Sequence, residues 1–176
     1  MDELERLYRA HAARLRAYAW RHVGPDHADD VVSEVFLVAA RRRDDLPDDA
    51  ALPWLLVVAR NVIRNHRRSG RRADDLWLAA VREQWHLPQG VDPADVVTER
   101  EEYVRALCSC SRPEREALLL VAWEGLTAEQ AAAVSGCSVR AFTVRLSRAR
   151  ARMRAALEPS TGTTPSPFLR LAEEPS

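Results

Sequence analysis

The chain has 176 residues, enough for one ordinary domain or two small ones, and its hydrophobic fraction of 47% is normal for a folded protein. Glycine is scarce, and alanine, leucine and arginine are abundant, so we expect an all-α fold without a sheet. The formal net charge is zero, which excludes the strongly positive field of a protein that coats DNA unaided.

Charge is unevenly distributed along the chain. Residues 1–72 carry 14 arginines against 11 acidic residues, and residues 111–158 carry 8 against 5. Between these two blocks, residues 73–110 carry 3 arginines against 8 acidic residues. Two mildly basic blocks thus flank an acidic one, and we expect two small helical domains joined by an acidic linker.

Other features of the composition point to a cytoplasmic protein without a metal site. The N-terminus lacks an apolar signal region, and no stretch approaches the roughly 18–20 apolar residues that span a bilayer. Cys108, Cys110 and Cys137 are odd in number and lack metal-ligand spacing, so we expect unpaired thiols. We expect no cofactor.

Apolar residues at helical spacing predict three helices in the first domain, residues 1–72. The first begins near Leu4 and ends where Gly24-Pro25 interrupts the pattern. Asp26 is the expected N-cap of the second, which ends near the arginines 41–43.

The third helix follows an acidic loop over residues 44–51. It is expected to begin near Pro53 and to run to Gly70. The segment 73–91 then mixes helical spacing with chain breakers, which predicts a partly helical linker.

Capping signals divide the second domain, residues 92–158, into four helices. The first begins at Asp92-Pro93, and the second has the capping box Ser111 to Glu114 and ends at Gly125. A second capping box, Thr127 to Gln130, opens a short helix that stops at residues 135–137. Ser138 should cap a last helix to about residue 157, and the tail 159–176 is expected to be flexible, with a possible short docking element at residues 168–171.

Residues 127–150 predict a helix-turn-helix, because a short capped helix, a glycine-containing turn and a second capped helix follow one another. The start of the second helix enters the major groove in such motifs. We therefore expect these residues to touch bases or nearby backbone: Ser138, Arg140, Ala141, Thr143 and Val144. Val139, Phe142 and Leu146 should face the core.

Four arginines continue down the same helix, on faces that can meet phosphates: Arg145, Arg148, Arg150 and Arg152. A solvated arginine face is the alternative interpretation.

The third helix combines amides and cations with Trp54. This set could hold single-stranded DNA through backbone charge and base contacts: Trp54, Asn61, Arg64, Asn65, His66, Arg67 and Arg68. For Trp54 a core position is the alternative. In the second helix, Asp30, Glu34 and Arg41 flank an apolar stripe, an arrangement suited either to docking on a partner helix or to a solvated face.

The C-terminal motifs resemble the promoter-recognition domain of extracytoplasmic-function sigma factors, a group of bacterial RNA polymerase subunits. The residues that carry the resemblance are Pro113-Glu114-Arg115, Glu124-Gly125-Leu126-Thr127 and the helix ending Arg145-Leu146-Ser147-Arg148-Ala149-Arg150. The resemblance implies that this domain binds the upstream (−35) promoter element.

The N-terminal domain fits the same family. Residues 28–36 resemble its polymerase-binding helix, and Pro53-Trp54-Leu55 with Ala59-Arg60-Asn61 resembles its downstream-element helix. The resemblance implies contacts to core RNA polymerase by Asp30, Ser33, Glu34, Phe36 and Arg41. It further implies that Asn61 and the loop 44–51 capture a base flipped from the melted (−10) element.

As the resemblance implies, the acidic linker would lie in a basic polymerase channel, and the partners would be core polymerase, promoter DNA and an anti-sigma factor. Three positions depart from the family pattern: Ser33 replaces a glutamine, Thr143 replaces a lysine, and Phe142 replaces a small or β-branched residue.

Two alternatives belong to other classes of protein. A free-standing helix-turn-helix regulator with a ligand- or partner-binding bundle would bind specific DNA tightly by itself. An enzyme is disfavoured, because the sequence contains no glycine-rich phosphate loop, nucleophile elbow or metal cluster.

Overall fold

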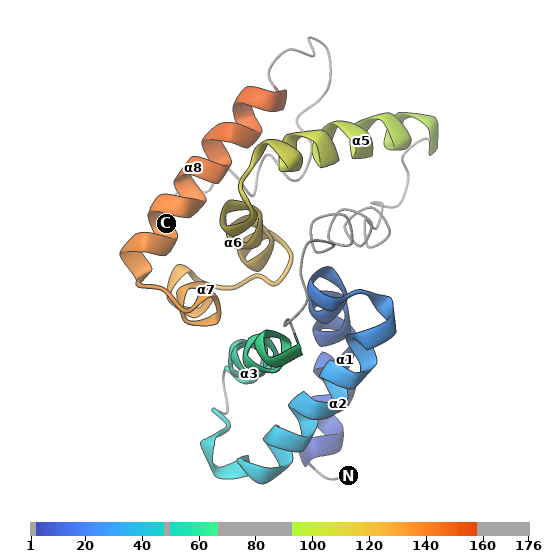
Figure 1. Ribbon diagram of the computed structural model, residues 1–176, viewed down its shortest axis with the longest axis vertical. Coiled ribbons are helices and arrows are strands. Elements are labelled where there is room, and N and C mark those ends of the chain that lie inside the picture. Colours follow the sequence, from blue (N-terminus) through green and yellow to red (C-terminus); the bar gives the residue numbers. More distant parts are fainter. Residues whose placement is uncertain (1–2, 48–49, 67–92, 158–176) are drawn as a thin grey trace. The chain divides into compact units, whose positions relative to one another are not determined.

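The computed structural model describes residues 3–47, 50–66 and 93–157, and all regular structure in those ranges is helical (Figure 1). This confirms the expected all-α fold. The chain divides into two compact units, Met1–His86 and Leu87–Ser176. The predicted linker 73–91, the C-terminal tail and the extension of the third helix to Gly70 lie outside the described residues.

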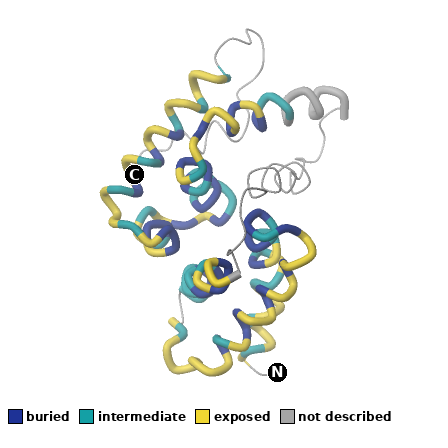
Figure 2. The backbone as a smooth tube through the Cα atoms, viewed as in Figure 1, coloured by how far each residue is buried: buried dark blue, intermediate teal, exposed yellow. Residues whose placement is uncertain are grey.

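The first unit is a bundle of three mutually packed helices. These are α1 (Glu3–Val23), α2 (Pro25–Arg41) and α3 (Ala51–His66), with a short 3₁₀ turn at Arg43–Asp45 between α2 and α3. The buried stripe of each helix faces the other two (Figure 2). Its largest fully buried side chains are Leu15, Tyr18, Val31, Val35, Leu55 and Leu56.

The junction between α1 and α2 differs from the expected one. The N-cap of α2 is Gly24 and not Asp26, and no side chain caps this end. Gly24 has a φ of 86° and donates its N–H to the carbonyl of Trp20 at 2.9 Å, so one residue ends α1 and begins α2. Only glycine adopts such a conformation easily, and Pro25 at the first helical position needs no partner for an N–H.

The second unit contains four helices: α5 (Pro93–Ser109), α6 (Arg112–Ala122), α7 (Ala128–Ser135) and α8 (Val139–Leu157). Helix α8 packs against each of the other three. Its buried residues Phe142, Leu146 and Ala149 recur at helical spacing, as expected for the core-facing stripe of an amphipathic helix.

Helix α6 ends at Ala122, three residues before the expected end at Gly125. Gly125 has a φ of 59°, and the turn through it brings the N–H of Leu126 to the carbonyl of Leu120 at 3.1 Å. Gly125 therefore belongs to the turn beyond the helix. This turn lets the N–H of Leu126 bond a carbonyl that has no partner within the helix.

No helix in the described part of the chain is long and apolar enough to cross a membrane.

Candidate nucleic-acid interface

Local hydrogen bonds hold α7 and α8 in a helix-turn-helix. At the start of α7, the N–H of Thr127 donates to Oε1 of Gln130 at 3.0 Å, and the N–H of Gln130 donates to the Thr127 hydroxyl at 3.3 Å. Gly136 ends the helix in the left-handed conformation, with a φ of 62°. Both features confirm the predicted capping box and glycine stop.

Ser138 begins α8 as predicted. Its Oγ accepts a hydrogen bond from the N–H of Ala141 at 3.2 Å, and its carbonyl accepts from the N–H of Phe142 at 2.9 Å. This cap defines the residue at which helical geometry begins, and so it sets the direction of α8 relative to the preceding loop.

The structure presents the predicted groove-facing residues on the first turns of α8. Ser138, Arg140, Thr143, Val144 and Arg148 are exposed, and Ala141, Arg145 and Arg150 are half-buried. Because residues three and four apart are neighbours on a helix, the exposed side chains of Arg140, Thr143, Val144 and Arg148 form one continuous surface opposite Phe142 and Leu146.

Val139 was expected in the core, but it is 42% exposed. Helical side chains lean toward the N-terminus of their helix. Val139 is the first residue of α8, so its side chain has no preceding turn of that helix to lie on.

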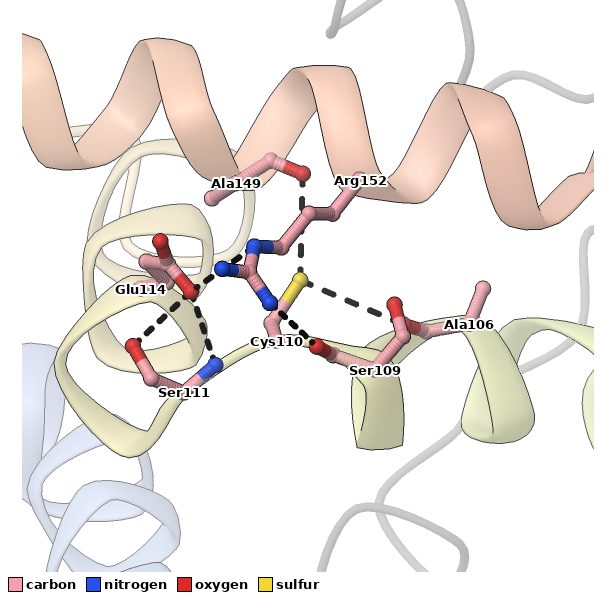
Figure 3. A network of polar contacts seen from close by, with 7 residues as sticks. All are labelled: Ala106, Ser109, Cys110, Ser111, Glu114, Ala149 and Arg152. Atoms are coloured by element: carbon pink, nitrogen blue, oxygen red, sulfur yellow. Dashed lines mark hydrogen bonds and ion pairs between the residues drawn. The ribbon is translucent and has the colours of Figure 1, made fainter.

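Arg152, which was expected on a face that can meet phosphate, also contacts the protein itself. Its Nε lies 3.5 Å from Oε2 of Glu114, and its Nη1 donates to the carbonyl of Ser109 at 3.1 Å (Figure 3). Arg152 thus connects α8 to the junction between α5 and α6. The predicted phosphate contact of this residue stays a prediction, because its side chain is 55% exposed.

The Glu114 carboxylate contacts two donor groups of Ser111 and the guanidinium of Arg152 (Figure 3). Its Oε2 accepts from the N–H and from the hydroxyl of Ser111, each at 2.8 Å, and it faces Arg152. The Ser111 N–H, the Ser111 hydroxyl and the positive charge of Arg152 together hold the pKa of this carboxyl below its ordinary value. The predicted capping box is therefore also a point of contact with α8.

The Cys110 thiol lies beside this network. Its Sγ is 3.7 Å from the carbonyl oxygen of Ala149 and 3.9 Å from that of Ala106, and burial raises the pKa of the thiol (Figure 3). Cys108, Cys110 and Cys137 are unpaired, as predicted. Among the described residues, no three His, Cys, Asp or Glu side chains are close enough to hold a metal ion.

In the first unit, α3 carries the candidate single-strand contacts. Asn61, Arg64 and Asn65 are exposed, and Trp54 is half-buried near the start of the helix. Trp54, Asn61 and Asn65 are spaced seven and four residues apart, which places them along one side of α3. Arg67 and Arg68 lie outside the described residues.

Arg42 is a neighbour of Trp54 that the sequence pattern did not indicate as a site residue. Its guanidinium carbon lies 5.9 Å from the centre of the Trp54 ring, and its Nε donates to Oδ2 of Asp45 at 2.7 Å. This distance permits a cation–π interaction. The only signal in the sequence was the arginine run 41–43, which we used to place the end of a helix.

Helix α2 carries the candidate polymerase contacts. Asp30, Ser33, Glu34 and Arg41 are exposed, but Phe36 is only 7% exposed, with its ring centre 4.9 Å from that of Tyr8. Phe36 belongs to the stripe that packs α2 in the bundle, so the structure assigns it to the core. The large apolar side chain that α2 does expose is the adjacent Leu37.

These features define an all-helical protein with a helix-turn-helix DNA-binding module. The chain also matches two families, Sigma-70 region 2 over residues 7–73 and Sigma-70 region 4 over residues 100–153. Both helical units are therefore covered by matches to one kind of transcription factor.

Relatives along most of the chain narrow the assignment. The ECF RNA polymerase sigma factor EcfG of Rhodopseudomonas palustris is 35% identical over 150 residues, which cover 81% of this chain and 78% of that protein. The ECF RNA polymerase sigma factor SigC of Mycobacterium tuberculosis is 35% identical over 134 residues, 75% of this chain and 71% of that protein. The chain belongs to the extracytoplasmic-function group of RNA polymerase sigma factors.

Solved structures share the fold. The sigma factor RpoE, in complex with the anti-sigma factor NepR from Bartonella quintana, matches with a TM-score of 0.61 and 24% identity, over 91% of this chain and 99% of that one. CnrH, in complex with the cytosolic domain of CnrY, matches with a TM-score of 0.57 and 26% identity, over 90% and 89%. Because both halves of the chain are matched, the comparisons favour a sigma factor over a free-standing regulator.

Proposed function

We propose that this sigma factor divides promoter recognition between its two units. Helix α8 binds the upstream element in the major groove, α3 with Arg42 binds the downstream element after melting, and the exposed face of α2 binds core RNA polymerase. The observation that carries the proposal is the surface of α8, where a capped start is followed by exposed side chains and by arginines that can reach phosphates.

On α3, the exposed amides of Asn61 and Asn65 would hydrogen-bond the edges of unstacked bases, and Arg64 would neutralise a phosphate. Trp54 and Arg42 would add a stacking surface and a positive charge near the start of the helix. Such a site would stabilise a flipped base, which offsets the few kcal/mol that flipping costs.

On α2, the proposed docking surface consists of Asp30, Ser33, Glu34 and Arg41 together with the exposed Leu37. The buried Phe36 packs against Tyr8 and holds this part of α2 against α1. We further propose that the protein catalyses no reaction, acts in the cytoplasm with the polymerase, and has an anti-sigma factor as a partner. The structure of CnrH with the cytosolic domain of CnrY supports a protein partner for such a fold.

The distribution of charge along the chain predicts how the free protein binds DNA. Each helical block has only a small excess of arginine, and the segment between them is acidic, so long-range attraction to DNA largely cancels within the chain. The free protein should therefore bind promoter DNA weakly. Assembly with core polymerase would make the second DNA contact intramolecular and would raise avidity.

The experiment is a titration of labelled promoter with the chain alone, with core polymerase alone and with both, followed by a transcription assay at physiological salt. We expect specific binding and transcript only from the mixture. Nanomolar specific binding by the chain alone, with no transcript from the mixture, would contradict the proposal and favour the free-standing regulator.

A further inference from the structure

The first two turns of α8 expose an apolar surface beside Arg140. Val139 is 42% exposed and Val144 is 44% exposed. Thr143 follows Val139 by four residues, and Val144 follows Arg140 by four, so these four side chains are neighbours on the helix surface. We call Val139, Thr143 and Val144 the methyl patch.

The hydroxyl of Thr143 is already engaged within the helix. Its Oγ1 donates to the carbonyl of Val139 at 3.0 Å. A hydroxyl has one proton, so this bond leaves Thr143 no proton to donate to a base. The side chain then adds its methyl group to the surface made by the two valines, and Arg140 is the only strong donor among the four side chains.

This composition restricts what the helix can read. Bases expose hydrogen-bonding groups in the major groove, and the apolar group that they expose there is the C5 methyl of thymine. Valine side chains form no hydrogen bonds with water, and burying one methyl group against another lowers the free energy of the complex. Guanine, in turn, is the usual partner of an arginine that reads a base edge.

We propose that the methyl patch reads thymine methyl groups in the upstream element, next to a contact made by Arg140. This inference rests on the proposed binding of α8 in the major groove. DNA is the favoured occupant, because the patch directly follows the helix cap at Ser138, and because Arg148 follows Val144 by four residues, with Arg145 between them in the sequence. Phosphate contacts by those arginines would position the helix, and the methyl patch would supply specificity.

The test removes single methyl groups from the DNA. Holoenzyme assembled from the full chain and core RNA polymerase is first used to select upstream elements from a randomised duplex library. Each thymine of the selected element is then replaced by deoxyuridine, which lacks only the C5 methyl. At one or more positions we expect binding to weaken about fourfold, the value for one buried methyl-sized group.

Three protein variants test which side chains are responsible: Val139→Ala, Val144→Ala and Thr143→Ser. The serine variant retains a hydroxyl for the Val139 carbonyl and loses only a methyl group. At least one of the three should bind thymine and uracil duplexes with nearly equal affinity at a position where the parent protein discriminates. Arg148→Ala is the matched control, which should weaken binding to every duplex and retain the thymine preference.

The outcomes separate the inference from the function on which it rests. If an upstream element is selected but no uracil replacement in it weakens binding, α8 still binds the element and the methyl-reading inference is wrong. The inference is also wrong if all three variants retain full discrimination, as they would if the patch served a protein partner. If no upstream element is selected at all, the proposed role of α8 itself fails.

Discussion

Arg152 near the end of α8 and Glu114 at the start of α6 are 38 residues apart in sequence, and their Nε and Oε2 atoms lie 3.5 Å apart. The Glu114 side chain is 8% exposed and that of Arg152 is 55% exposed, so the pair joins a buried carboxylate to a cation at the surface. This contact gives Arg152 a partner within the second unit, in addition to any contact with DNA.

Arg152→Ala should destabilise the second unit. The variant removes the charge facing Glu114 and the hydrogen bond to the Ser109 carbonyl, and we expect a loss of about 1 kcal/mol in the free energy of unfolding. Chemical denaturation followed by circular dichroism measures it. Arg154→Ala is the control, since Arg154 is exposed on the same helix and its removal should change stability by less than about 0.5 kcal/mol. Unchanged stability of Arg152→Ala with lost promoter binding would instead make Arg152 a DNA contact.

Stability of the second unit should fall in acid partly through Glu114. Its pKa is lower in the folded protein than in the unfolded chain, chiefly because it accepts from the Ser111 N–H and hydroxyl. The folded state then favours the charged form, so this stabilisation is present above the unfolded pKa and is lost as the pH falls through the folded pKa. Denaturation of the wild type and of Glu114→Gln at a series of pH values tests this. The difference between them should be largest near neutral pH and should shrink in acid, and a constant difference would rule the carboxylate out as the cause.

Arg145→Ala and Arg148→Ala should weaken binding of the upstream element by the holoenzyme. For a phosphate contact, we expect affinity to fall about equally for all sequences, and the slope of log affinity against log salt to decrease by about one. For a base contact, specificity should relax at one position. Fluorescence titration over a range of salt concentrations distinguishes the two. Normal binding and transcription by both variants at raised salt would contradict the proposal that α8 binds the upstream element in the major groove.

Asn61→Ala should impair promoter opening more than polymerase recruitment. The proposed partner of Asn61 is an unstacked base, which exists only after melting. Permanganate footprinting measures the open complex, and gel-shift binding measures the closed one. Asn61 is exposed on α3, so thermal unfolding of the variant should match the wild type. An equal loss in both assays together with lower stability would assign Asn61 to the fold.

Much of the second unit could be predicted from the sequence, because its signals act over short distances. The capping pairs Ser111 with Glu114 and Thr127 with Gln130 join residues three apart, and Gly136 ends a helix through its own backbone conformation. Residues close together in the chain are sufficient to form such structures. The helix-turn-helix follows from three of these signals in succession: the Thr127–Gln130 capping box, Gly136 and the Ser138 cap. The same short-range patterns carried the resemblance to sigma factors.

Only the tertiary structure decided which side chains of a helix are buried or make contacts with another helix. Phe36 and Leu37 are adjacent apolar residues, yet the packing of α1 on α2 buries the first and exposes the second. Arg148 and Arg152 are both arginines on α8, and it is Arg152 whose side chain lies 3.5 Å from Oε2 of Glu114 and donates to the Ser109 carbonyl. Contacts of this kind depend on which helices come within a few ångströms of each other, and a periodic pattern along one helix does not contain that information.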